Sequence, residues 1–110
     1  MTTQVFHILL SLAGGARHGY GIIKDVRQHT GDRVRIGTGT LYTALQRLLD
    51  ADWIEETTDR PAAGDDDARR QYYRLTGLGR TALREEAERL ERAVAEARGR
   101  RVLTGRSKRS

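Results

Sequence analysis

The stretch that decides the fold reads GTGTLYTALQRLLDA and covers residues 37–51. Its apolar residues fall at spacings of four, three and one, on one face of a helix: Leu41, Leu45, Leu48 and Leu49. The opposite face is polar: Thr43, Gln46, Arg47 and Asp50. We therefore predict a helix from Thr40 to about Ala51, with Thr38 or Thr40 as its N-cap. Glycines and threonines at a helix start also suit the close approach of a phosphate.

Two helices are expected before this one. Residues 3–13 carry apolar side chains at helical spacing, and the glycine pair at 14–15 ends that helix. A second helix is expected from about Tyr20 to Thr30, with Gly31 as its stop. A connector with two further glycines, DRVRIGTGT, then leads into the third helix.

Two short segments after the third helix are rich in aromatic and β-branched residues, WIEETT at 53–58 and QYYRL at 71–75. We expect them to pair as an antiparallel hairpin joined by a loose, charged loop. Trp53 is expected to anchor the hairpin to the third helix. Since neighbouring strand residues face opposite ways, at most one of Tyr72 and Tyr73 should be fully buried.

A long helix is expected after the hairpin, capped by Thr76. Its apolar residues repeat at spacings of 4, 3, 4 and 3, which is a heptad pattern: Leu83, Ala87, Leu90, Val94 and Ala97. A helix in this position has little of its own chain to pack against. These residues form either a core stripe within the monomer or a dimer seam. The family resemblance described below favours a dimer seam, helped by Phe6 and Leu9 of the first helix.

Three helices followed by a hairpin is the layout of a winged helix-turn-helix, in which the second and third helices form the helix-turn-helix and the hairpin is the wing. The expected fold class is thus mainly α with a small β-hairpin, plus a C-terminal dimerisation helix. We expect a DNA-binding domain over 1–75, the dimerisation helix over 76–98 and a disordered basic tail over 99–110.

The charge of the chain is uneven. Its net charge is +5 and its pI about 10.2, yet residues 98–110 hold six basic residues and no acidic ones. The body is near neutral, so the overall charge is a weak argument for nucleic-acid binding. The tail would add sequence-independent attraction to DNA or be a solvated end. No apolar run approaches the roughly 20 residues of a membrane span, and we expect a cytoplasmic protein.

No metal, cofactor or enzymatic activity is expected. The chain has no cysteine, and His7, His18 and His29 are spaced eleven apart across a helix break at 14–15. We interpret this alignment of histidines as accidental. The acidic run 65–67 lacks the further ligands of a calcium loop. Paired carboxylates in a cleft and a phosphate loop are also lacking, which argues against an enzyme.

Three blocks of the sequence resemble the PadR family of bacterial transcriptional regulators: HGYGI at 18–22, GTLYTALQRLLDADWI at 39–54 and YYRLTGLGRTAL at 72–83. They occur in the family's order and spacing, and the resemblance covers residues 3 to about 97. It implies a homodimeric repressor that binds double-stranded operator DNA, and a small-molecule effector could relieve that binding.

By position, the resemblance places Tyr20 and Lys24 on the helix that crosses the DNA backbone. The residues it places along the recognition helix are Thr38, Thr40, Tyr42, Thr43, Gln46 and Arg47. It places basic residues, Arg69 and Arg70, before the second wing strand. Gln46 and Arg47 have the length to read base edges, whereas the hydroxyls suit phosphate contacts.

The sequence departs from the family pattern at three places. Thr43 stands where members commonly have proline, and Asp52 and Trp53 stand where they have a glycine-leucine pair. Asp65, Asp66 and Asp67 put three acids into the wing loop and disfavour a deep wing contact with DNA. With the near-neutral body, these acids favour the alternative hypothesis, a winged-helix module that binds a protein and no specific DNA.

Overall fold

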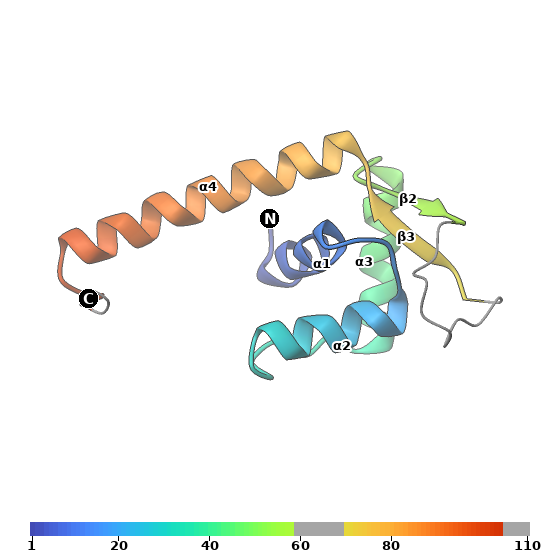
Figure 1. Cartoon of the computed structure of the whole chain (residues 1–110), viewed down its shortest axis with the longest axis horizontal. Helices are drawn as coiled ribbons and strands as arrows, with labels where there is room; N and C mark the ends of the chain where they lie inside the picture. The colour runs from blue at the N-terminus through green and yellow to red at the C-terminus, as the bar shows by residue number, and fades with distance from the viewer. Residues whose placement is uncertain (59–69, 105–110) are drawn as a thin grey trace.

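The computed structural model describes residues 1–58 and 70–104. Along the chain the elements are α1 (Thr3–Ala13), β1 (Arg17–His18), α2 (Gly19–His29), α3 (Thr38–Asp50), β2 (Ile54–Thr57), β3 (Tyr72–Leu75) and α4 (Gly77–Gly99). Helices α1 to α3 and the small sheet form one body, from which α4 projects (Figure 1). This arrangement confirms the predicted winged helix-turn-helix with its C-terminal helix.

The core lies where α1, α2, α3 and the sheet meet. Its main buried residues are Ile8, Leu9, Leu12, Ile22, Val26, Leu41, Leu45, Leu48, Ile54, Tyr73 and Leu83. Two of the expected dimer contacts, Leu9 and Leu83, belong to this core. Leu9 has no exposed surface within the single chain, so the monomer already buries the side chain that was expected to help the dimer seam.

Three of the four helices begin with a side-chain cap. Thr2, His18 and Thr76 accept hydrogen bonds from the backbone N–H of Val5, Gly21 and Gly79, so the expected cap at Thr76 is confirmed. Helix α3 differs, because its N-cap is Gly37 and no side chain bonds to its first turn. The predicted threonine N-cap is therefore wrong: α3 begins at Thr38, two residues earlier than expected, and both threonines lie inside the helix.

The sheet has a third strand that the sequence did not reveal. Strand β1 pairs with β3, and β3 pairs with β2, both antiparallel. Tyr72 and Tyr73 are only 3% and 6% exposed, so the prediction that one of them would be outside is wrong. The reason is that β3 is the central strand. Tyr73 packs into the core, while the ring of His18 on β1 lies edge-on against Tyr72 at 5.2 Å.

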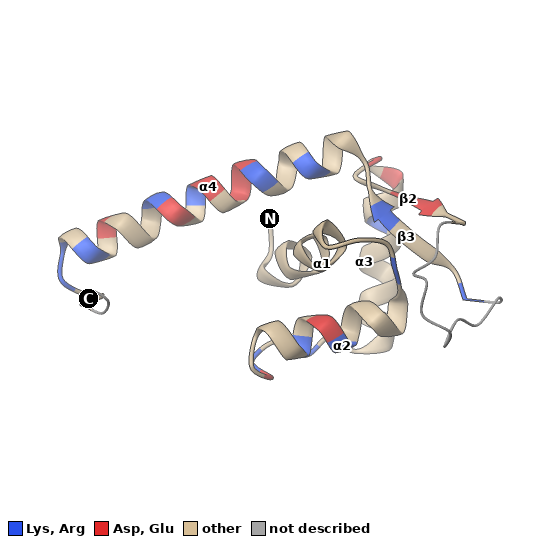
Figure 2. Cartoon of the chain, viewed as in Figure 1, with Lys and Arg blue, Asp and Glu red and all other residues tan. Residues whose placement is uncertain are grey.

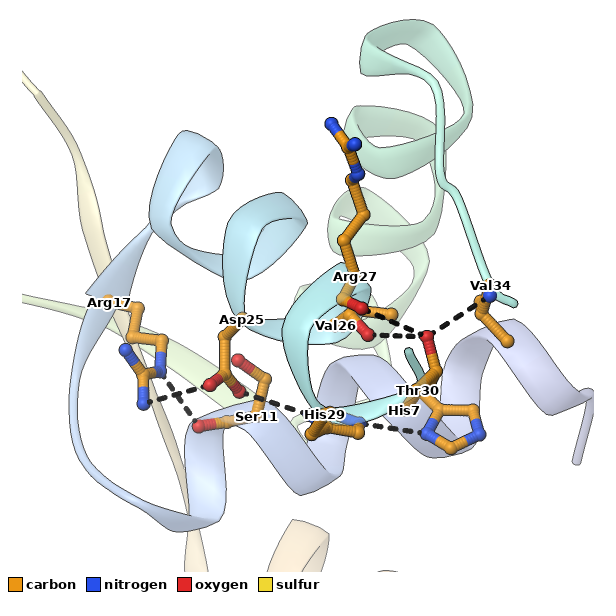
Figure 3. Close-up of polar contacts among 9 residues, drawn as sticks. All are labelled: His7, Ser11, Arg17, Asp25, Val26, Arg27, His29, Thr30 and Val34. Carbon is orange, nitrogen blue, oxygen red and sulfur yellow. Dashed lines mark hydrogen bonds and ion pairs between the residues drawn. The ribbon is translucent and has the colours of Figure 1, made fainter. Parts of the chain in front are cut away.

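A chain of polar contacts links α1 to α2 (Figure 3). His7 Nδ1 lies 3.0 Å from His29 Nε2, and His29 Nδ1 lies 3.4 Å from Asp25. Arg17 lies 3.6 Å from Asp25 and donates from Nε to the carbonyl of Ser11. His7 and His29, 22 residues apart, thus meet across the packed helices α1 and α2, and His18 takes no part in this contact. No group of three or more metal-ligating residues occurs within the part of the chain that the structure describes.

A left-handed turn joins α3 to the sheet. Asp52 has φ 62°, and the N–H groups of Asp52 and Trp53 donate to the carbonyls of Leu49 and Leu48, each at 3.0 Å. This closing pattern normally has glycine at the left-handed position. Trp53 packs against the core, as expected, and its carbonyl accepts the N–H of Thr76 at 3.1 Å.

Helix α4 is attached to the body only near its start. Gly79 and Leu83 are its buried residues, and a Cβ at Gly79 would collide with the carbonyl of Trp53. After α4, the N–H of Val102 donates to the carbonyl of Ala97 at 2.9 Å. Arg69, Asp65 to Asp67 and the end of the tail lie outside the described residues. Within residues 1–58 and 70–104, no helix is long and apolar enough to cross a membrane.

Replacing Asp52 by glycine should stabilise the protein. A side chain at φ 62° is strained, and glycine removes that strain at the position where this turn favours it. We expect Asp52→Gly to raise the free energy of unfolding by about 0.5–1 kcal/mol, because relief of roughly 1–2 kcal/mol of left-handed strain exceeds the roughly 0.5–1 kcal/mol of extra chain entropy that glycine loses. Asp52→Ala should lower it, because the strain stays. Thermal unfolding of the three proteins tests this, and an Asp52→Gly protein that melts below wild type would contradict it.

Stability should fall as the pH falls below neutrality, partly through His7. Partial burial, and then the nearby His29, lower the pKa of His7 below its ordinary 6.5. Below pH 6.5 the unfolded chain therefore takes up this proton more readily than the folded one, so folding loses stability down to the folded pKa. When urea unfolding is measured from pH 7.5 to 5, the free energy of unfolding should fall less steeply for His7→Gln than for wild type. Equal slopes would show that His7 does not contribute.

Candidate nucleic-acid interface

Helix α3 presents an exposed polar face above a buried leucine face. Leu41 and Leu45 are at most 1% exposed and fix the orientation of the helix on the core. The predicted recognition residues that lie exposed on α3 are Thr38, Thr40, Tyr42, Thr43, Gln46 and Arg47. The structure therefore leaves all six predicted residues accessible on α3.

Along the centre of this face, the residues in the N-terminal half are small and the residue at the C-terminal end is acidic. With about 100° between successive residues, Gly39, Thr43 and Asp50 lie most nearly opposite the leucines. Gly39 and Thr43 are in the N-terminal half, where their size lets another molecule come near the helix backbone. Asp50 stands at the C-terminal end and repels phosphate. A nucleic acid would therefore be received by the N-terminal half of α3.

The two predicted base readers point to different sides of α3. Gln46 donates from Nε2 to Asp50 Oδ1 at 3.0 Å, so its amide is held along the helix. Arg47 borders a hollow of about 550 Å³ between α3 and the beginning of α1, together with Thr40 and Thr43. The two side chains are about 100° apart around the helix, so they cannot read the same base pair in the same way.

Tyr42 joins α3 to the start of α2. Its ring is 48% exposed, and a Cβ at Gly19 would collide with its phenol oxygen. Gly19 therefore allows α3 to lie close to α2, a role that sequence reasoning missed, although the HGYGI block contains it. Burial raises the pKa of Tyr73, and the nearby Tyr42 and Glu56 raise it further, so its hydroxyl is neutral at physiological pH.

A second group of predicted residues gathers beside α2. Tyr20 is 57% exposed, Lys24 Nζ lies 5.5 Å from the centre of its ring, and the guanidinium carbon of Arg70 lies 5.7 Å from it. These are cation–π distances. The three side chains border a hollow of about 480 Å³ that Arg17 and His18 also line. Helix α2 and the start of β3 thus share one basic site, which we call the α2–wing site.

The predicted dimer residues fall into two sets. Leu9 and Leu83 are buried in the single chain, and Phe6 packs against the same core. Leu90 and Val94 are 37% and 42% exposed, on the part of α4 that leaves the body. Acidic and basic residues alternate along this projecting helix (Figure 2), so its apolar residues stand among solvated charges.

Comparison with known proteins agrees with this geometry. The model of the transcriptional regulator PadR-like family matches residues 8–85, from α1 through the helix-turn-helix and the sheet into α4. The chain belongs to the PadR-like family. The resemblance read from the three sequence blocks is thereby confirmed, and so is the expectation that the protein is not an enzyme, since this is a family of transcriptional regulators.

Individual relatives extend the comparison over most of the PadR-like chain. The transcriptional regulator Rv3488 of Mycobacterium tuberculosis is 34% identical over 93 residues, which cover 84% of this chain and 80% of that protein. A Lysinibacillus sphaericus protein named Uncharacterized protein X is 37% identical over 69 residues, 63% of this chain. The match spans only 61% of the length of that second relative.

Solved structures share the fold of this PadR-like protein. A transcriptional regulator from Clostridium thermocellum is 29% identical, with a TM-score of 0.69 over 86% of this chain and 89% of that one. Bacillus subtilis PadR, solved in complex with operator DNA, is 22% identical, with a TM-score of 0.63 over 78% of this chain and 47% of that one. At that identity the second likeness shows the fold alone.

Proposed function

We propose that this PadR-like regulator is a homodimeric repressor that binds operator DNA through α3. The proposal rests on the structure of that helix. Its exposed face is polar and has small residues in the N-terminal half, and its leucines fix it to the core. The α2–wing site stands beside it with cations suited to the DNA backbone. The complex of Bacillus subtilis PadR with operator DNA supports the proposal by analogy of fold.

Contacts with the phosphate backbone are assigned to the start of α3 and to α2. The first turn of α3 has no side-chain cap, so its N–H groups and the hydroxyls of Thr38 and Thr40 can face a phosphate. Tyr20 and Lys24 do the same from α2. These contacts set the position of the protein on DNA without reading sequence.

Sequence is read by the longer side chains of α3. Arg47 is suited to the paired acceptors of a guanine and Gln46 to an adenine edge. The bond to Asp50 uses one of the two amide N–H donors of Gln46 and holds the amide along the helix, so its side chain has less freedom to meet a base than an unengaged amide. Thr43 has a methyl group and a hydroxyl in the middle of the face, where the family commonly has proline.

Dimerisation is assigned to α4. The helix has 23 residues, about 34 Å of length, and within the described chain only Gly79 and Leu83 of it are buried. Leu90 and Val94 lie a helical turn apart on the projecting part, and burying them needs a second copy. Two copies related by a twofold axis would present two α3 helices to half-sites about 10 bp apart.

Repression would be relieved by a small-molecule effector that changes the dimer. Because each α3 is rigidly attached to its own core, a change in the pairing of the two α4 helices alters the distance between the two α3 helices.

The alternative, a module that binds a protein and no specific DNA, is favoured by Asp50 on the exposed face of α3 and by the near-neutral charge of residues 1–97.

Removing the two base readers should cost sequence preference. We expect Gln46→Ala with Arg47→Ala to lower the ratio of specific to non-specific affinity by roughly ten- to a hundredfold, the discrimination of one or two base contacts. The operator is first obtained by selecting genomic fragments, and binding is then measured against a scrambled duplex. Arg92→Ala on α4 serves as the control. A double variant that discriminates as well as wild type would remove both residues from base recognition.

Charges placed in the α4 seam should separate the dimer. We expect Leu90→Glu and Val94→Glu together to give monomers, because two buried pairs of carboxylates would face each other across the seam. Sedimentation velocity measures the state, and circular dichroism checks that the helices persist. Arg92→Glu brings the same residue type to the opposite side of α4 and should leave the dimer intact. An unchanged dimer in the double variant would refute the assignment.

A further inference from the structure

In the connector between α2 and α3, basic and apolar residues alternate: Arg33, Val34, Arg35 and Ile36. Val34 packs against the core and Ile36 is 4% exposed, whereas both arginines are exposed. The two apolar side chains therefore fix this segment on the body, and the two guanidinium groups are left accessible. The proposed function assigns no role to either arginine.

Hydrogen bonds hold the start of the connector on α2. Oγ1 of Thr30, the C-cap of α2, donates to the carbonyl of Val26 at 2.7 Å and accepts the N–H of Val34 at 3.1 Å. Between Thr30 and Val34, Gly31 and Asp32 turn the chain with φ of 60° and 66°. The connector is thus tied to the body at its start by Thr30 and further along by its two apolar side chains.

The charges of the two arginines are available to an anion. Asp32, the carboxylate next to them in the chain, already pairs with Arg27, whose Nε lies 3.1 Å from its Oδ1. Within residues 1–58 and 70–104, neither Arg33 nor Arg35 forms an ion pair. Two unpaired cations two residues apart create a positive potential that attracts an anion.

The connector lies between two groups of residues that are assigned to the DNA backbone. Its start, at 31–32, borders a hollow of about 490 Å³ together with Tyr20 and Lys24 of α2. Its end leads into the first turn of α3, whose N-cap is Gly37. Since two residues of fully extended chain span about 7 Å, the Cα of Arg35 lies no farther than this from that of Gly37. The side chain of Arg35 can therefore reach an anion beside this turn.

We propose that Arg33 and Arg35 form a phosphate-binding arm of the helix-turn-helix, in which each arginine contacts a separate phosphate of the DNA strand that passes the start of α3. The inference rests on the proposed function and adds two cations to the hydroxyl and N–H groups assigned to the backbone at this place. Because contacts with phosphates read no sequence, the arm strengthens binding to every duplex and makes it more dependent on salt.

Alanine variants of the arm test this role. Arg33→Ala, Arg35→Ala and the double variant are compared with wild type by fluorescence anisotropy on the selected operator and on a scrambled duplex, over a range of salt concentrations. Arg92→Ala removes the same charge from the projecting part of α4 and is the control. Arg35→Lys keeps the charge without the planar guanidinium. Thermal unfolding checks the fold of each variant.

We expect each single alanine variant to melt close to wild type, since both side chains are exposed. Each should bind both duplexes roughly tenfold more weakly, because the dimer loses two exposed charge contacts. The slope of log affinity against log salt should fall by about two in each single variant and by about four in the double variant. Arg35→Lys and Arg92→Ala should keep the wild-type slope.

Three outcomes would overturn the inference while leaving the proposed function intact. These are wild-type affinity and salt slope in either single alanine variant, a slope that falls as much in Arg92→Ala as in the arm variants, and a loss confined to the operator with unchanged binding to the scrambled duplex. Failure of the wild-type protein to bind any duplex would overturn the proposed function, and this inference with it.

Discussion

The burial of one face of α3 is the interaction on which the rest of the structure depends. Leu41 and Leu45 lose nearly all their exposed surface in the core, and each buried leucine contributes about 1.5–3 kcal/mol. Rotating α3 by even a third of a turn would expose them. The orientation of the outward residues is therefore fixed by the burial of the leucines.

Two glycines let neighbouring elements pack closely against α3 and against the turn that follows it. Gly19 lets Tyr42 of α3 lie on the start of α2, and Gly79 lets the start of α4 lie on the carbonyl of Trp53. The first contact sets α2 relative to α3, and the second ties α4 to the turn that ends α3. Helix α3 is thus fixed to α2 on one side and to the start of α4 on the other.

The sequence predicted those features that repeat along the chain, and it missed those that depend on contacts between distant residues. Helical periodicity predicted all four helices, and the aromatic strands predicted the hairpin. Strand β1 is two residues long and has no pattern, so it exists only because Arg17 and His18 meet β3. His7 and His29 are 22 positions apart, and His18 and Arg70 are 52 apart. Of the candidate site, the exposed residues of α3 were predictable, whereas the aromatic support beneath Arg70 was not.

The first turn of α3 has a thermodynamic consequence for operator binding. A side-chain N-cap contributes about 1 kcal/mol to a helix relative to alanine and only a few tenths of a kcal/mol relative to glycine. Helices α1, α2 and α4 each have such a cap, whereas α3 begins at Gly37 without one. In the proposed complex a phosphate oxygen would occupy the place of the missing cap. Part of the binding free energy would then be the free energy of ordering this turn. The first turn of α3 would fray in the free regulator, and binding of the operator would order it.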